Sequence, residues 1–189
     1  MTTRRIANGR VELRLSGAGG QGLITAGVIL SEAAVMDRLE VVQTQSYGPE
    51  ARLGASRAEV IIATETIAYP QVTQPDVILC LSQESFDKYI SDADEDTLVI
   101  VDATNVEVNG STNGAQVHAF PITETAVELG HKVVANVVAL GALNALAEVV
   151  SPQSLKEAVL RRVPEKHRQL NARALDAGQA LAAEPATAP

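Results

Sequence analysis

The stretch Leu13–Ser56, LRLSGAGGQGLITAGVILSEAAVMDRLEVVQTQSYGPEARLGAS, decides the fold of this 189-residue chain. It starts with an apolar strand, turns at a cluster of glycines, continues as an apolar helical segment at Leu23–Val35, and reaches a second strand at Leu39–Thr44. A strand, a glycine turn, a helix and a second strand in this order are typical of α/β proteins with a parallel sheet. We therefore predict a three-layer, Rossmann-like α/β fold.

The glycine turn has the spacing of an anion-binding motif. Gly17, Gly19 and Gly22 fit the pattern G-x-G-x-x-G, and Gly20 and Gln21 complete the turn. In such a turn the missing side chains permit a sharp bend and a close approach of a ligand to the backbone, and the first amides of the helix attract an anion. The turn is a candidate phosphate or carboxylate site. A purely structural turn that packs the helix on the strand is the alternative.

The second strand lacks the acidic residue that an NAD-binding fold uses. In that fold an Asp or Glu at the end of the strand, roughly 20 residues beyond the glycines, binds the ribose hydroxyls. Here Leu39–Thr44 continues into Gln45, whereas Asp37 and Glu40 lie before the strand or at its start. An ordinary NAD site is therefore disfavoured.

The rest of the chain continues the alternation of strands and helices. Apolar runs predict strands at 58–63, 76–81, 97–101 and 116–120, and helical spacing predicts helices at 86–90, 133–147, 152–163 and 165–181. The strand 58–63 follows a loop rich in Gly and Pro, and we expect it to form an antiparallel edge on a mostly parallel sheet. We predict a single domain over residues 1–181 and a disordered, Ala- and Pro-rich tail at 182–189.

The composition excludes several classes of function. A formal net charge of −8 disfavours nucleic acid and anionic membrane surfaces as partners, because both would be repelled. The uncharged segment Val133–Ala147 is shorter than the roughly 20 residues of a membrane-spanning helix. No apolar segment of a secretory signal follows the basic N-terminus. We expect a cytoplasmic protein without a membrane partner.

The chain also lacks the residues for a redox centre of its own. Cys80 is the only cysteine and lies in an apolar strand, whereas an iron–sulfur cluster takes four cysteine thiolates. His118, His131 and His167 have no second ligand at metal-binding spacing, and His131 is expected to cap a helix or face solvent. We therefore expect no metal site in this chain. Its candidate site residues are assigned to binding, and none is assigned a catalytic role.

Polar and charged residues gather in the loop after the second strand, which carries Tyr47, Gly48, Glu50 and Arg52. Arg52 either anchors a phosphate or carboxylate, or pairs with Glu50 or a partner's acid and braces the loop. Tyr47 covers either a ligand or an interface. Gln83 is a further candidate, because it follows the end of a buried strand, where ligands collect in open parallel sheets.

Three segments together resemble one protein family. They are GAGGQG at Gly17–Gly22, SYGPEAR at Ser46–Arg52 and SRAEV at Ser56–Val60. At this separation they are similar to the gamma subunits of the 2-oxoacid:ferredoxin oxidoreductases, and the likeness continues through Tyr69–Pro70, Asp76, Gln83 and Asn136–Ala142. One position departs from the family: Leu53 stands where its loop usually has a glycine, which disfavours positive φ and alters the space for a ligand.

The resemblance implies an activity that the chain shares with other subunits. The family converts a 2-oxoacid, CoA and an electron acceptor into acyl-CoA, carbon dioxide and reduced acceptor, and 2-oxoglutarate or an aryl 2-oxoacid such as phenylglyoxylate is the favoured substrate. It implies alpha, beta and ferredoxin-like partner subunits that hold thiamine diphosphate, Mg and 4Fe–4S clusters. The acceptor would be ferredoxin, or NAD reached through a flavin subunit. This chain would help to receive CoA, with the glycine turn as a phosphate cradle.

Two other functions stay open at this stage. A stand-alone nucleotide-binding enzyme of Rossmann type would bind NAD or a flavin and remain monodisperse. A purely structural subunit would be needed for assembly, and mutations between Gly17 and Gly22 would leave CoA kinetics unchanged.

Overall fold

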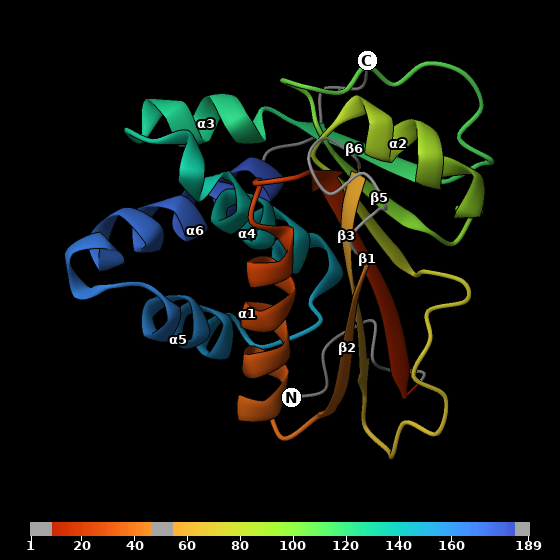
Figure 1. Cartoon of the computed structure of the whole chain (residues 1–189), viewed down its shortest axis with the longest axis horizontal. Helices are drawn as coiled ribbons and strands as arrows, with labels where there is room; N and C mark the ends of the chain where they lie inside the picture. Colours follow the sequence, from red (N-terminus) through yellow and green to blue (C-terminus); the bar gives the residue numbers. More distant parts are fainter. Residues whose placement is uncertain (1–8, 47–54, 184–189) are drawn as a thin grey trace.

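The computed structural model describes residues 9–46 and 55–183, which form a six-stranded sheet with helices on both faces (Figure 1). The strands are β1 (Arg10–Ala18), β2 (Glu40–Ser46), β3 (Ala55–Ala63), β4 (Val77–Cys80), β5 (Leu98–Asp102) and β6 (Gln116–Phe120). The helices are α1 (Leu23–Met36), α2 (Gln83–Tyr89), α3 (Ile122–Glu128), α4 (Ala135–Ala147), α5 (Pro152–Arg162) and α6 (Arg168–Ala183). Three short 3-10 turns are η2 (Ile90–Asp92), η3 (Lys132–Val134) and η4 (Glu165–His167).

The sheet has the order β2-β3-β1-β4-β5-β6 and is mixed. The pairs β1–β4, β4–β5 and β5–β6 are parallel, whereas β3 is antiparallel to both β1 and β2. The mostly parallel sheet with an antiparallel side is thereby confirmed. The strand predicted at 58–63 is not the edge itself: β3 lies between β2 and β1, and β2 is the edge strand. The polar end of β2 is therefore not directly beside the glycine turn.

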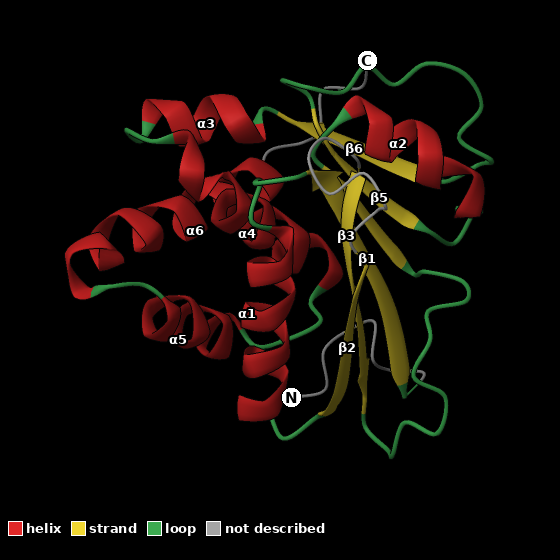
Figure 2. Ribbon diagram, viewed as in Figure 1, coloured by secondary structure: helices red, strands yellow, loops and turns green. Residues whose placement is uncertain are grey.

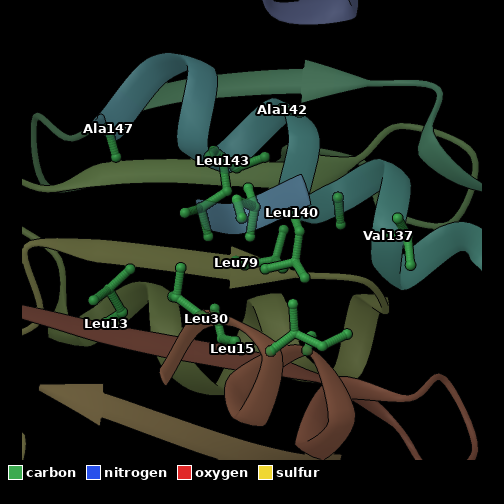
Figure 3. Close-up of a cluster of buried hydrophobic side chains, with 14 of the residues drawn as sticks. Leu13, Leu15, Leu30, Leu79, Val137, Leu140, Ala142, Leu143 and Ala147 are labelled. Atoms are coloured by element: carbon green, nitrogen blue, oxygen red, sulfur yellow. The ribbon is translucent and has the colours of Figure 1, made fainter. Parts of the chain in front are cut away.

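The larger core lies between the sheet and the helices α1 and α4. Alternate residues of β1, Val11, Leu13 and Leu15, point to this side and are fully buried. Figure 3 shows Leu13 and Leu15 facing Leu30 of α1, with Leu79 of β4 and Leu140 of α4 beside them. The period of two in β1 thus places every second side chain in one core.

The opposite face of the sheet carries a smaller core under α2 (Figure 2). Ile78 and Cys80 of β4 point to this side, where they join Phe86 and Tyr89 of α2. Ser82 caps α2, because its hydroxyl accepts a hydrogen bond from the amide of Ser85. Helices on both faces give the predicted three layers.

The helices agree with the predicted segments except at two places. The short helix α3 was not predicted, and α6 continues to Ala183, so it includes the first two residues of the segment assigned to the tail. α4 is buried over most of its length, as expected for an uncharged helix. Within the described ranges, no helix combines the length and the apolar character that crossing a bilayer requires.

Candidate functional site

The glycine turn lies where two neighbouring parallel strands are followed by helices on opposite faces of the sheet. β1 and β4 are neighbours and parallel; α1 follows β1 on one face and α2 follows β4 on the other. In open α/β sheets the crevice outside the carboxyl ends of two such strands is the usual ligand site. The structure therefore places Gly17–Gly22 on one side of this crevice and Gln83 on the other.

Two of the predicted site residues are occupied by contacts within the chain. The amide of Ala18 donates to Oε1 of Gln21 at 2.7 Å, and Nε2 of Gln21 donates to the carbonyl of Leu81 at 3.0 Å. A Cβ on Gly17 would collide with this Oε1 and lie 2.9 Å from Cδ1 of Leu23. Gln21 thus ties the end of β1 to the end of β4, and Gly17 leaves the space for it.

Gly22 also serves packing. It is the N-cap of α1 with a φ of 75°, where an L side chain is strained, and a Cβ there would lie 2.7 Å from Nδ2 of Asn136. That amide donates to the carbonyl of Gly22 at 3.1 Å, so α1 and α4 meet at this point. The other amide of α4, Asn144, exchanges two hydrogen bonds with Val150. Both amides therefore have partners within the chain.

The open part of the turn is Gly19 and Gly20. Both residues are exposed, and a Cβ on either would meet no atom within 4 Å. The following 14-residue helix α1 has no acidic residue in its first turn and no side chain that caps its N-terminus. Its first amides thus lack an internal anion, and a ligand's phosphate or carboxylate would be favoured there.

Gln83 does not join this open turn; it braces another loop. Its Oε1 accepts from the amide of Glu107 at 2.8 Å, and its Nε2 donates to the carbonyl of Glu107 at 3.2 Å and to Asp87 at 2.8 Å. Gln83 lines a polar hollow of about 620 Å³ together with both carboxylates. Because these carboxylates face the same space, the hollow disfavours an anion.

Four predicted residues, Tyr47, Gly48, Glu50 and Arg52, lie outside the described residues, as does Leu53. The ends of the strands that flank them are described. Gly17 pairs with Ser56 of β3, and Ser46 of β2 pairs with Arg57. The first residues of β3 therefore lie directly beside the glycine turn.

Cys80 has the environment of a structural thiol. It is fully buried, and burial raises its pKa to about 11, although the Ser16 hydroxyl lies 3.5 Å from its sulfur and lowers the pKa. Across the described ranges, no group of three or more His, Cys, Asp and Glu residues could hold a metal ion. A protonated, buried thiol is neither a nucleophile nor a cluster ligand.

We expect Cys80 to be inert in the folded chain. An aromatic disulfide reagent at pH 8 should modify less than about one tenth of the thiol in an hour, and all of it within minutes in denaturant. Because burial raises the pKa of Cys80 from its ordinary value of 9.0 to about 11, the contribution of this thiol to stability should be constant below pH 9 and fall as the pH rises from 9 towards 11. Rapid reaction of the folded chain at pH 8 would contradict this assignment.

The described histidines play local roles. Nδ1 of His131 accepts from the amide of Val133 at 3.1 Å and caps η3, which confirms the capping interpretation. His118 stacks on Phe120 with ring centroids 6.1 Å apart, and partial burial lowers its pKa.

Two charged clusters were not predicted. Arg14 of β1 is buried; its Nε donates to Glu59 at 2.9 Å, it pairs with Asp92, and its guanidinium lies 5.1 Å from the ring centroid of Tyr89. A charged residue inside the apolar strand LRL was the available signal. Arg14 and Glu59 lie opposite each other on the neighbouring strands β1 and β3, so this cluster stabilises the fold.

The second cluster explains Asp37. Its carboxylate accepts from the amide of Ser151 at 2.5 Å and from the hydroxyls of Ser151 at 2.8 Å and Ser154 at 2.5 Å. It thus lies at the N-terminus of α5, where a negative charge is favoured. Asp37 thus holds α1 to α5, and it lies at the end of α1 opposite to the glycine turn.

Comparisons with known proteins agree with this architecture. The family model described as pyruvate ferredoxin/flavodoxin oxidoreductase matches residues 12–181. The 2-oxoglutarate synthase subunit KorC of Methanocaldococcus jannaschii is 45% identical over 187 residues, which cover 97% of this chain and 100% of KorC. The crystal structure of the keto/oxoacid ferredoxin oxidoreductase gamma subunit from Geobacter sulfurreducens has a TM-score of 0.85 and 47% identity, covering 93% of this chain and 97% of that one.

A longer relative contains the same fold as one part. The structure of 2-oxoglutarate:ferredoxin oxidoreductase from Magnetococcus marinus, with 2-oxoglutarate, coenzyme A and succinyl-CoA bound, matches with a TM-score of 0.86 and 25% identity. The match covers 95% of this chain and 32% of that one. The glycine turn, the mixed sheet and these matches along almost the whole chain agree, and the chain belongs to the pyruvate ferredoxin/flavodoxin oxidoreductase family as a chain of the gamma-subunit type.

Proposed function

We propose that this chain is the gamma subunit of a multi-subunit, thiamine diphosphate-dependent 2-oxoglutarate:ferredoxin oxidoreductase. The observation that carries the proposal is the 45% identity to KorC from end to end of both chains. The pyruvate synthase subunit PorC of Methanothermobacter marburgensis is 30% identical over 167 residues. This difference favours 2-oxoglutarate over pyruvate, and it gives no support to an aryl 2-oxoacid.

The proposed reaction balances as 2-oxoglutarate, CoA and oxidised acceptor giving succinyl-CoA, carbon dioxide and reduced acceptor. Cleavage of the bond between C1 and C2 releases carbon dioxide, two electrons pass to the acceptor, and the sulfur of CoA takes the acyl group. Thiamine diphosphate, held with Mg in a partner subunit, would supply the stabilisation of the carbanion. The one cysteine of this chain is buried, which supports 4Fe–4S clusters on partner subunits.

The role of this chain would be to receive CoA and to complete the complex. Gly19, Gly20 and the first amides of α1 form the proposed phosphate cradle, since no side chain of the described residues fills this space. Gly17, Gln21 and Gly22 would shape the cradle from below through their internal contacts. Arg52 would supply a positive charge and Tyr47 a cover; both precede β3 in the sequence, and the start of β3 lies beside the turn.

Replacing Arg52 by alanine should raise the apparent KM for CoA. A charge-assisted hydrogen bond contributes about 1.5–3 kcal/mol, so we expect a rise of roughly 10- to 100-fold, with an unchanged KM for 2-oxoglutarate.

Gly19→Ala should also raise the KM for CoA without lowering the melting temperature, because the added Cβ would meet no atom of the described chain within 4 Å. Steady-state kinetics of the assembled complex measure both. An unchanged KM for CoA together with impaired assembly would assign Arg52 to bracing the loop.

Native purification tests the proposed function as a whole. The tagged chain should bring down partner subunits whose visible spectrum shows iron–sulfur absorption, and the complex should reduce ferredoxin only when both 2-oxoglutarate and CoA are present. A monodisperse chain that binds NAD or a flavin would support a stand-alone enzyme instead. A complex whose CoA kinetics stay unchanged when the glycine turn is mutated would support a purely structural subunit. The flavin-linked route to NAD, the single domain at 1–181 and the cytoplasmic location stay predictions.

A further inference from the structure

One segment of the chain carries a charge opposite to that of the rest. Residues 152–173 contain six of the 15 Lys and Arg residues but only two of the 23 Asp and Glu residues, a formal charge of +4 against −12 for the remainder. All six cations are exposed on α5, η4 and the first turns of α6. A concentration of positive charge on an acidic protein is a feature of surface recognition, because the fold itself does not need it.

Four of these cations, Lys156, Arg161, Arg162 and Arg168, line two adjoining hollows; we call them the basic face. One hollow, of about 450 Å³, is lined by Lys156, Arg161 and Arg168. The other, of about 400 Å³, is lined by Arg161 and Arg162. Arg161 belongs to both, so the two hollows form one continuous surface over α5. Figure 1 shows α5 beside α1, on the side of the helices that faces away from the sheet.

The second hollow has an apolar lining. Val28, Val35 and Met36 of α1 line it together with Val41 of β2, the outermost strand. Val35 is 60% exposed and lies with the other apolar residues of this hollow, so it adds to a contiguous apolar patch. An apolar hollow rimmed by arginines fits an aliphatic or aromatic side chain of another protein between carboxylates.

The ion pairs that these cations make within the chain are weak. Arg161 pairs with Glu157 one helical turn away, Arg162 pairs with Glu32 at 2.5 Å, and Lys156 lies 3.3 Å from Asp176. Exposed pairs of this kind contribute little to stability. The cations can therefore exchange their present partners for carboxylates of another chain at little cost.

The relatives differ in whether the gamma-type fold is joined to a further part. KorC of M. jannaschii is matched over its whole length, whereas this chain covers 37% of the ketoisovalerate oxidoreductase subunit VorA of Methanothermobacter thermautotrophicus and 32% of the M. marinus chain. In those two proteins the gamma-type fold is joined covalently to a further part about twice its size. KorC, which is matched over its full length, has no such further part, so a gamma-type chain of its kind needs non-covalent contacts to keep an equivalent partner in place.

We propose that the basic face docks a carboxylate-rich surface of the partner subunit that corresponds to the remainder of these longer relatives. The inference rests on the proposed role as a subunit of a multi-subunit oxidoreductase. Opposite charges on the two surfaces guide the encounter and fix its orientation, and an apolar side chain of the partner enters the hollow between α1, α5 and β2. Nucleic acid is a poorer occupant, because the remaining charge of −12 repels a long polyanion.

A matched pair of charge reversals tests the proposal. The variant Arg161→Glu/Arg168→Glu changes the basic face, and the control Lys88→Glu/Lys132→Glu makes the same change of net charge at exposed cations on α2 and η3. Thermal unfolding first establishes that both variants fold. Each full chain, with the wild type, is then titrated against the complex purified without its gamma subunit, at 50 and at 500 mM NaCl.

We expect the basic-face variant to raise the Kd for the gamma-less complex at least about tenfold at 50 mM salt, and less than about threefold at 500 mM, because salt screens exposed charges. The control should bind like the wild type. Equal affinities of the two variants for the complex would overturn the proposal. It would also be overturned if the basic-face variant lost binding to duplex DNA that the wild type shows, while its binding to the complex stayed unchanged. A wild-type chain that does not bind the complex at all would instead refute the proposed function.

Discussion

Replacing Gly178 by alanine is expected to lower the free energy of unfolding by about 3 kcal/mol. α6 crosses α4 at Gly178 and Gly141 with backbone against backbone. A Cβ on Gly178 would overlap the carbonyl oxygen of Val138 and lie 2.8 Å from its carbonyl carbon and 3.0 Å from the amide nitrogen of Ala142. These are main-chain atoms of α4 that cannot rotate away, so α6 must move. The overpacking costs more than the roughly 1 kcal/mol that alanine gains over glycine in a helix.

Chemical denaturation of the full chain measures this loss, and Gly19→Ala is the matched control. The two variants make the same chemical change. A Cβ on Gly19, however, would meet no atom within 4 Å, and Gly19 does not have a positive φ that would strain alanine. The control should stay within about 0.5 kcal/mol of the wild type. If both variants unfold at the same denaturant concentration, the close crossing of α4 and α6 is not what stabilises this pair of helices.

Replacing Asp102 by alanine is the second substitution with a large expected effect, a loss of about 3 kcal/mol. Asp102 ends β5 and is fully buried. Its carboxylate accepts from the amides of Thr104 at 3.2 Å and Thr123 at 3.1 Å, from Nδ2 of Asn105 at 2.7 Å and from the hydroxyl of Thr123 at 2.5 Å. Hydrogen bonds to a charged group contribute about 1.5–3 kcal/mol each, and water replaces part of them where the donors are exposed.

The conservative variant Asp102→Asn separates shape from charge. It keeps the volume but turns one acceptor into a donor that faces other donors, so we expect an intermediate loss of about 1–2 kcal/mol. The exposed Asp96→Ala, next to η2, should change stability by less than about 0.5 kcal/mol. A melting temperature of Asp102→Ala equal to that of Asp96→Ala would show that the four hydrogen bonds contribute nothing to the folded state.

The structure has the strand, turn and helix from β1 to α1 where the sequence predicts them, and the binding role of the turn stays a prediction. The strand, turn and helix from β1 to α1 are local in sequence, so the pattern of apolar residues and glycines was sufficient to place them. Which glycine serves packing was not visible. Gly22 is explained by Asn136, and Gly17 leaves space for Gln21, whose side chain is held by the carbonyl of Leu81, so the deciding partners Asn136 and Leu81 lie far along the chain. The described structure therefore narrows the open part of the turn to Gly19 and Gly20.

The sequence analysis missed helix α3 for the same reason, a partner that lies far along the chain. Its N-cap position is Pro121, which offers no side-chain hydrogen bond, so the usual local start signal is absent. The carboxylate of Asp102 instead accepts from the amide of Thr123, 21 residues away. A capping group that comes from another strand cannot be recognised before the strand order is known.

The sequence by itself determined the α/β class, the elements with clear periodicity and the family resemblance, because each of these depends on residues that are close along the chain or at fixed spacing. Only the tertiary structure decided that β3 lies between β2 and β1, that Asp37 holds α5, and that four cations of α5 and α6 share one surface with Val35. Those facts depend on pairings between distant segments, where the free energy of burial and hydrogen bonding selects one arrangement from many that the same local pattern permits.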